Sequence, residues 1–317
     1  MKTGAIVIAT RGSALALAQA NQILGLCRAT FPNRSFELRI IKTTGDKLQT
    51  ASLANPNAKL PKGLFTKELE VALLDGSADL AVHSLKDLPT ELPDGLQLGA
   101  VTAREDPRDV LVLRAPWKAL SDLPAGAVVA TSSPRRAAQL KLLRSDLKCV
   151  EIRGNVGTRL RKLVAGQNLH ATLLAAAGLN RLGYRLADVG SLTGSDVPPG
   201  IHAQAFDPQE MIPAVGQAAI GIEIRAGAAD LAAICARLNH MDTWHCITAE
   251  RAFLNAMGGG CQSPVAAHAV IREGRLQLTA VSFQTGRANT GAGLGDPANA
   301  AAIGRIVAAS IDAPKLA

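Results

Sequence analysis

Lys86 and Asp87 are the first residues whose types and spacing suggest chemistry. They follow the apolar run Ala78–His83, which predicts a strand, and they precede Pro89. Ligands of open parallel sheets bind beyond the carboxyl ends of the strands, so both side chains are expected to face a binding site. A carboxylate there can stabilise positive charge or exchange a proton. The alternative is a turn that carries solvated charges.

Arg135 and Arg136 lie in the first turn of a helix predicted over Ser133–Leu143, directly after a strand predicted over Ala127–Thr131. Arginine is unfavourable there, because its charge opposes the positive end of the helix dipole. An anion held between the arginines and the helix N-terminus would explain both residues, since guanidinium and free N–H groups bind carboxylates. The alternative is an exposed arginine pair on the helix surface.

The same arrangement recurs at Arg153, which ends a short predicted strand before Asn155 begins the next helix. Gly154 between them would let a ligand approach the backbone closely. Neither a phosphate loop nor a dinucleotide fingerprint is present. Two such anion sites predict a ligand with several carboxylates, and Arg11 and Arg181 follow other predicted strands and add positive charge.

Cys261 differs from the other cysteines in its surroundings. Three glycines precede it and Gln262 follows it, so its sulfur is expected to be exposed. Such a thiol can be a nucleophile or a covalent attachment point, although a structural cysteine in a loop fits the sequence equally well. The remaining cysteines lie in apolar patterns and are expected to be buried: Cys27, Cys149, Cys235 and Cys246.

Charge and composition narrow the class of partner. The 317 residues carry a net charge of +8, but aromatic residues make up only 3% of the chain. The basic residues occur singly or in pairs, so small anionic ligands are expected rather than nucleic acid. The sequence has no apolar run of about eighteen residues and no Cys-x-x-Cys pair, so neither a membrane span nor a metal site is expected.

The start of the chain and its cysteine content indicate where the protein works. Only the short apolar run Ala5–Ile8 precedes Thr10, so no secretory leader is expected. An odd number of irregularly spaced cysteines indicates a reducing compartment, and a cytoplasmic monomer is expected.

Alternating strand and helix patterns predict an α/β fold with two units of similar plan. Strands predicted at Ile6–Ala9 and Phe36–Thr43 alternate with helices, the first of which Ser13 would cap, and the plan restarts near Ala127. From Thr243, a helix and an antiparallel strand pair predict a smaller α+β domain.

Three further segments are expected to connect or cover these units. Arg104–Asp109 is charged and contains a proline, which favours a hinge. Asp46–Pro61 and Tyr184–Gln209 exceed ordinary loop lengths, so each is expected to be a lid, an insertion or disordered. Lys62 follows the first of these and would close over an anionic ligand if that segment is a lid, the alternative being a solvated loop.

Motifs along nearly the whole chain resemble the porphobilinogen deaminase family. In chain order they are Ile8–Arg11, Lys62–Glu70, His83–Asp87, Arg104–Asp109, Thr131–Arg136, Arg153–Arg159, Pro213–Gln217, Ala249–Ala252 and Gly259–Gln262. Two departures are Pro134, where leucine is usual, and Ala218, where the family commonly has glycine. Ala218 is expected to narrow the room around the backbone.

The resemblance implies two α/β domains like those of type II periplasmic binding proteins, with the active site in the cleft between them, and a small α+β C-terminal domain. Residues 1–103 and 219–238 would form the first domain, residues 104–218 the second and residues 239–317 the third. The chain would return to the first domain through Ile220–Ile224.

The resemblance also implies an activity. The chain would be a deaminating transferase of porphyrin and heme biosynthesis that condenses four porphobilinogen molecules head-to-tail into hydroxymethylbilane and releases ammonia. A thioether from Cys261 would hold the family's dipyrromethane cofactor. Asp87 would stabilise positive charge on the pyrrole nitrogen and assist proton transfer.

The remaining site residues follow from the same resemblance. Besides Cys261, cofactor binding is expected at Lys86, Asp87, Thr131, Ser133, Arg135, Arg136, Arg153 and Gly154. Substrate binding is expected at Arg11, Ser13, Lys62, Phe65, Arg153, Arg159 and Arg181. Every pyrrole ring carries an acetate and a propionate, so a growing chain needs many cations.

Two other functions are compatible with parts of the sequence. A non-catalytic clamshell protein that binds a small carboxylate would share the fold but would need neither Asp87 nor Cys261. A cysteine hydrolase would need a histidine base near Cys261, and His240, His245 and His268 are the candidates.

Overall fold

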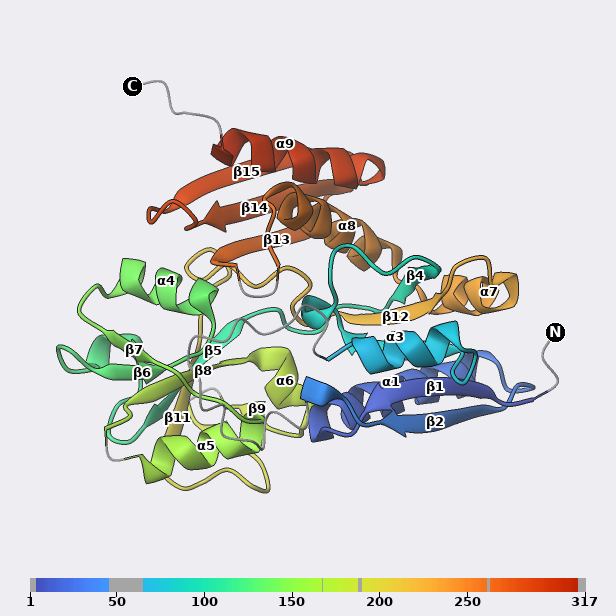
Figure 1. Ribbon diagram of the computed structural model, residues 1–317. Coiled ribbons are helices and arrows are strands. Elements are labelled where there is room, and N and C mark those ends of the chain that lie inside the picture. The colour runs from blue at the N-terminus through green and yellow to red at the C-terminus, as the bar shows by residue number, and fades with distance from the viewer. Residues whose placement is uncertain (1–3, 46–64, 167, 188–189, 261–262, 313–317) are drawn as a thin grey trace. The chain divides into compact units, whose positions relative to one another are not determined.

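The computed structural model describes residues 4–45, 65–166, 168–187, 190–260 and 263–312 (Figure 1). The chain divides into two compact units. One consists of Met1–Arg104 with Ala219–His245, and the other of Glu105–Ala218 with Cys246–Ala317. The predicted division into three domains is not tested by this grouping and stays a prediction.

The first unit is built on a five-stranded sheet with the order β2-β1-β3-β12-β4. The parallel strands are β1 (Ile6–Arg11), β2 (Phe36–Ile41) and β3 (Leu80–Ser84), as the sequence predicts. Between β3 and β4 (Leu96–Val101) lies β12 (Ile220–Arg225), antiparallel to both. Figure 1 shows this orange strand among blue and cyan neighbours.

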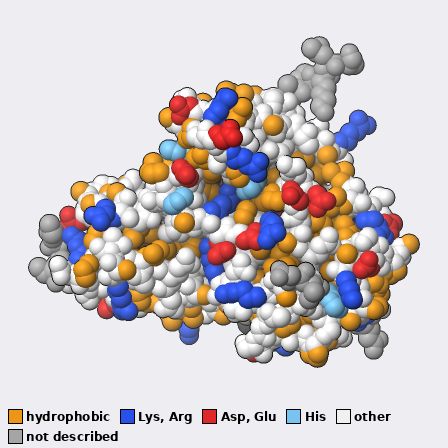
Figure 2. Space-filling model, turned by 180° about the vertical axis from the view of Figure 1, so that it is seen from behind, with side chains coloured by type: hydrophobic (Ala, Val, Ile, Leu, Met, Phe, Trp, Pro, Cys, Tyr) orange, Lys and Arg blue, Asp and Glu red, His pale blue; other side chains and the backbone are white. Residues whose placement is uncertain are grey.

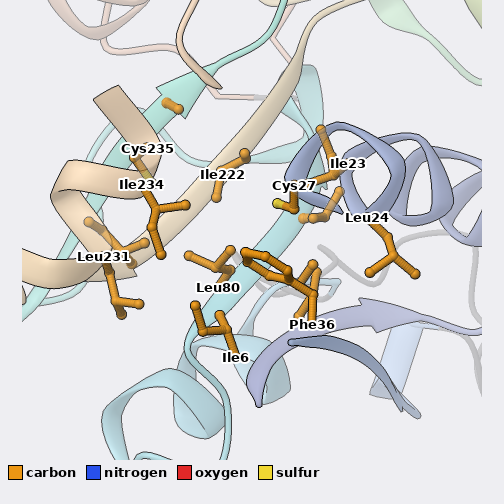
Figure 3. Packing of buried hydrophobic residues seen from close by; sticks show 14 of the residues in the cluster. Ile6, Ile23, Leu24, Cys27, Phe36, Leu80, Ile222, Leu231, Ile234 and Cys235 are labelled. Atoms are coloured by element: carbon orange, nitrogen blue, oxygen red, sulfur yellow. The ribbon is translucent and has the colours of Figure 1, made fainter. Parts of the chain in front are cut away.

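Helices cover both faces of this sheet. The helices α1 (Ala14–Thr30) and α7 (Ala229–Leu238) pack on one face, and α3 (Lys67–Leu74) packs on the other. Figure 3 shows the apolar core under α1 and α7, where strand and helix side chains interlock around Leu80. Ser13 caps α1 as predicted, because its hydroxyl accepts the Ala16 N–H at 3.3 Å.

The second unit contains a sheet with the same plan, in the order β7-β6-β8-β5-β11. The strands β6 (Val128–Ala130), β7 (Lys148–Val150) and β8 (Ala171–Ala175) are parallel. The strand β5 (Asp109–Arg114) is antiparallel to β8 and to β11 (Ile201–Ala205). Two parallel-containing sheets, each with an inserted antiparallel strand, confirm the predicted α/β fold.

The helices of the second sheet also lie on opposite faces. The helix α4 (Pro134–Leu143) packs on one face, and α5 (Val156–Ala165) and α6 (Ala176–Arg181) pack on the other. Both α4 and α5 begin where a strand of the sheet ends, as the sequence predicts.

The segment Tyr184–Gln209 is more ordered than expected. It forms a small antiparallel pair, β9 (Arg185–Leu186) and β10 (Leu192–Thr193), and then the edge strand β11. Tyr184 is buried in the core beside α5, and the described part of the segment is ordered. Its strands are too short to show alternation in the sequence. The other long segment, Asp46–Pro61, lies outside the described residues.

The C-terminal part forms a sheet of its own, with the order β13-β14-β15. The bounds are α8 (Met241–Ala256), β13 (Val265–Arg272), β14 (Arg275–Ser282), β15 (Asn289–Gly295) and α9 (Ala300–Asp312). The predicted antiparallel pair is confirmed in β13 and β14. None of the helices in the described part of the chain combines the length and apolar character that a membrane span requires.

Candidate active site

A pocket of about 70 Å³ lies in the first unit, where β1 and β3 end. It is lined by Arg11, Ser13, Leu15, Ala16, Gln19, Phe65, Thr66, Val82, His83, Ser84 and Asp87. The carboxyl ends of parallel strands are where this class of sheet binds its ligands. The structure therefore has a pocket where the sequence predicts a site.

Four of the predicted residues meet in this pocket: Arg11, Ser13, Phe65 and Asp87. The guanidinium carbon of Arg11 lies 4.1 Å from the centre of the Phe65 ring, a cation–π contact that orients the charge. Asp87 ends the short helix η1 (Leu85–Asp87), which follows β3 directly. The pocket thus offers a cation for carboxylates and a carboxylate for N–H groups or positive charge.

Two other predicted residues of this region do not line the pocket. Lys86 belongs to η1 but is not among the lining side chains. Lys62 lies outside the described residues, as does Cys261.

Sequence reasoning missed Gln19, Ser84 and His83 as lining residues. The Gln19 side-chain amide donates to the Ser84 hydroxyl at 2.9 Å, which ties α1 to the end of β3. Behind them, His83 Nε2 lies 2.9 Å from a carboxylate oxygen of Glu223 on β12. The sequence did contain a signal for this pair, because His83 and Glu223 are titratable residues within the otherwise apolar strands β3 and β12.

In the second unit, Arg135 and Arg136 share one buried carboxylate. A terminal nitrogen of Arg135 lies 2.7 Å from one oxygen of Asp109, and one of Arg136 lies 2.6 Å from the other. Burial alone would raise the pKa of Asp109, but the two guanidinium groups hold it well below its usual value. These arginines therefore already contact one carboxylate of the protein, and the alternative of an exposed arginine pair is excluded.

The net charge of Arg135, Arg136 and Asp109 determines whether they could also bind a carboxylate ligand. Two guanidinium groups face one carboxylate, so positive charge is left over beside the N-terminus of α4. Arg136 also donates to the Leu173 carbonyl at 2.9 Å and Arg135 to the Ile212 carbonyl at 2.7 Å. The excess charge suits the acetate and propionate groups of a pyrrole ligand.

Polar contacts bring the N-termini of α4 and α5 to the same edge of the sheet. The Ser132 hydroxyl donates to the Ile152 carbonyl at 2.7 Å and accepts the Ile152 N–H at 3.0 Å. Ser133 caps α4 by accepting the Arg136 N–H at 3.4 Å, and the Thr131 hydroxyl accepts the Ser133 N–H at 3.2 Å. Thr131 and Ser133 thus shape the loop that precedes α4.

Arg153, Gly154 and Arg159 lie at the N-terminus of α5. Arg153 is 43% exposed in its side chain and lies 3.4 Å from Glu151, so its contact is an open surface pair. Gly154 has a φ of +116°, and a Cβ there would lie 2.7 Å from the Thr158 methyl group, so glycine is required. The Arg159 Nε donates to the Gly154 carbonyl at 2.8 Å.

Arg181 is the last residue of α6, and its side chain binds the backbone at Ala218, where the segment Glu105–Ala218 of the second unit ends. Its guanidinium donates to the Ala218 carbonyl at 2.7 Å, and burial lowers its pKa. Ala218 has a φ of +72°, a left-handed conformation that favours glycine. Alanine is tolerated there at a cost in backbone strain.

The described cysteines have different environments. Cys27, Cys235 and Cys246 are buried, as predicted, whereas Cys149 is partly exposed. Burial raises the pKa of Cys27 to about 11 and that of Cys235 to about 12, so both thiols are unreactive at neutral pH.

The basic side chains do not form one continuous patch on the face shown in Figure 2. There, Lys and Arg are interspersed with acidic and apolar side chains.

Comparison with known proteins places this site in a family. Residues 6–233 match the model of the porphobilinogen deaminase dipyromethane cofactor binding domain, and residues 244–313 match that of the porphobilinogen deaminase C-terminal domain. The porphobilinogen deaminase of Chromobacterium violaceum is 47% identical over 305 residues, which cover 96% of this chain and 93% of that one. That of Syntrophobacter fumaroxidans is 43% identical over 310 residues, covering 95% and 92%.

Solved structures resemble this chain less. One of them is the methionine binding protein MetQ, which has a TM-score of 0.41 and 12% sequence identity, and the match covers 74% of this chain and 87% of MetQ. The sequence matches instead span nearly the whole chain, and they include the strands and helices that carry Arg11, Asp87 and Arg135. The chain belongs to the porphobilinogen deaminase family.

Proposed function

We propose that the chain condenses four porphobilinogen molecules head-to-tail into hydroxymethylbilane, on a dipyrromethane primer held by Cys261. Membership of the family makes it a tetrapyrrole-building transferase with a dipyrromethane cofactor. One observation supports the finer assignment most strongly: Arg11, Phe65 and Asp87 line a single pocket where β1 and β3 end. Family membership does not favour the non-catalytic clamshell alternative.

Asp87 is the residue that handles developing positive charge in this proposal. Loss of ammonia from porphobilinogen leaves a ring whose nitrogen carries positive charge. A carboxylate aimed at that N–H stabilises it and can assist proton transfer. Arg11 in the same pocket binds a substrate carboxylate, and its contact with Phe65 restricts where the guanidinium can lie.

The cofactor, when bound, supplies the pyrrole chain to which substrate units are added. In this proposal the thioether comes from Cys261, and the excess positive charge around Arg135 and Arg136 binds carboxylates of the primer. Lys86, Thr131, Ser133 and Gly154 are proposed to complete that site. Arg153, with its exposed guanidinium, is proposed to bind further carboxylates together with Arg159 and Arg181. Ser13 and Lys62 are proposed to bind substrate.

The mass of the denatured chain tests the covalent part. Wild-type protein incubated with porphobilinogen should carry a two-pyrrole adduct, and peptide digestion should map it to Cys261. Cys261→Ser should lack the thioether adduct, while Cys149→Ser, at a partly exposed cysteine, should keep it. An unmodified wild-type chain after this incubation, or an adduct at another residue, would refute the proposed attachment.

Replacement of Asp87 tests the catalytic part. Asp87→Asn should lower kcat about 10²-fold or more, because the neutral amide neither stabilises the charge nor takes a proton, yet bound pyrroles should remain. The control is Asp94→Asn at an exposed position of the same unit. Product formation measured by absorbance decides: a wild-type rate in Asp87→Asn would eliminate the role of Asp87.

A further inference from the structure

A buried imidazole–carboxylate pair borders the pocket of the first unit. His83 lines the pocket, and its Nε2 lies 2.9 Å from a carboxylate oxygen of Glu223. The two side chains are only 4% and 0% exposed. Gly221 lies opposite His83 in the sheet, so Glu223, two residues along β12, lies on the same face. The sheet pairing therefore holds the carboxylate against the ring.

The charges around this pair come from three directions. On α3, Glu70 interacts with both members of the pair, and burial followed by the negative charges of Glu223 and Glu68 raises the pKa of Glu70. Toward the pocket lie Arg11 and Asp87. Toward the other end of the strands, Arg225 lies 3.3 Å from Asp79 and neutralises it. The charged and titratable groups nearest the pair are thus Glu70 on α3 and Arg11 and Asp87 in the pocket.

The proposed reaction has to move one proton at each condensation. Porphobilinogen carries a protonated aminomethyl group; its C–N bond breaks, the electron pair stays on nitrogen, and ammonia departs. A free α-carbon then forms the new C–C bond and gives up its proton. The proton and the ammonia together make ammonium, so the balance needs no other reactant.

Asp87 cannot carry out both tasks at the same moment. While it stabilises a positive pyrrole nitrogen it must remain a carboxylate, and accepting the proton would remove that charge. An imidazole backed by a carboxylate can take the proton instead, because the partner charge stabilises the imidazolium.

We propose that His83, held by Glu223, is a second proton-accepting residue of the pocket, which takes up the proton released by each condensation and passes it to the ammonia that the same condensation has already released. This assignment rests on the proposed function. It explains why a histidine in a buried strand borders the pocket with its far nitrogen on a buried carboxylate. Glu223 acts through His83 and is a positioning residue.

Two variants and one control test the assignment. His83→Gln should lower kcat about 10²-fold and remove one limb of its pH profile. Glu223→Gln, which keeps the shape and a hydrogen bond, should move that limb to lower pH, because a neutral amide no longer favours the imidazolium. His202→Gln, a half-buried histidine on β11, should leave the profile unchanged.

Two readouts independent of turnover accompany the kinetics. Urea unfolding shows how much of each variant is folded, so that kcat is expressed per folded molecule. Histidine NMR signals of the holoenzyme show the protonation directly: the signal missing in His83→Gln should change with pH in the wild type, and at lower pH in Glu223→Gln.

The outcomes separate this inference from the function on which it rests. A wild type that forms no hydroxymethylbilane from porphobilinogen overturns both. An active wild type whose two variants lose unfolding free energy but keep the wild-type pH profile overturns the role of His83 alone, because the pair then only ties β3 to β12. A His83 signal that does not change between about pH 5 and 9 overturns it as well.

Discussion

Glu70 is a buried carboxyl group on the inner face of α3, and its burial makes the stability of the protein depend on pH. Its pKa is raised first by burial and further by the nearby charges of Glu223 and Glu68. The folded protein therefore holds this proton to higher pH than the unfolded chain does. The stabilisation is complete below the ordinary glutamate pKa and is lost as pH rises through the raised value.

Glu70→Gln should remove this part of the pH dependence, because an amide does not titrate. The free energy of unfolding of the wild type, relative to the variant, should fall as pH rises from 4 toward 8. Urea unfolding at several pH values measures the difference, with Glu91→Gln at an exposed position as the control. A wild-type-to-variant difference that stays constant over this range would contradict the assignment.

Single residues also mark the limit of sequence-based prediction at the site. The first-turn arginines Arg135 and Arg136 predict an anionic ligand, and that stays a prediction, but the structure also gives them an anionic partner within the protein. The anion is Asp109, which the sequence places in a charged connector and the structure places at the buried start of β5. Its partners lie 26 and 27 residues away along the chain, so no local pattern reports the pair.

At the scale of elements, two glycines inside helices are under opposite constraints. Gly304 of α9 lies against α8: a Cβ there would collide with the Ala249 carbonyl oxygen and lie 2.9 Å from the Phe253 nitrogen. Gly25 of α1 has no heavy atom within 4 Å of the corresponding position. The same substitution should therefore have opposite effects at the two sites.

Gly304→Ala should lower the free energy of unfolding by about 3 kcal/mol, because α8 and α9 must separate. Gly25→Ala should raise it by about 0.5–1 kcal/mol, because alanine restricts the unfolded chain and meets no atom in the folded one. Chemical denaturation of both variants beside the wild type measures the two shifts. Equal signs would show that the α8–α9 contact is looser than described.

Helices and strands were predicted correctly where the apolar pattern extends over several residues. They were missed where the element is short or where glycines take the place of apolar residues. Predicted strands at β1, β3, β6 and β8 and predicted helices at α1, α4 and α5 are confirmed. The strand β15 escaped because Gly291, Gly293 and Gly295 occupy the face that packs on α9, where added side chains would meet Ile303 and Val307. A strand that buries glycine shows no apolar alternation.

At the scale of the whole molecule, the first unit depends on a strand from a distant part of the chain. β12 lies between β3 and β4, so residues 1–104 alone would leave β3 with an open edge and β4 without a partner. That fragment should show no cooperative unfolding by circular dichroism. Joining residues 219–245 to it through a flexible linker should restore a cooperative transition, and a cooperative transition in the shorter fragment would contradict this dependence.

The duplicated plan could be predicted from the restart of the strand–helix pattern near Ala127. The return of the chain through Ile220–Ile224 could not, because an apolar run reports burial and not which sheet receives it. Family resemblance supplied that connection, and the pairing of β12 with β3 confirms it.

The late arrival of β12 has a consequence for how a cell makes this protein. On the ribosome, roughly 120 residues are added between the end of β4 at Val101 and the start of β12 at Ile220. At about 5–20 residues per second, that is a wait of roughly 6–24 s. During this interval β3 offers an unpaired edge to other nascent chains, while the strands from β5 to β11 of the second sheet are being synthesised. Slower codons or chaperone capture across residues 105–218 should therefore change the yield of folded protein.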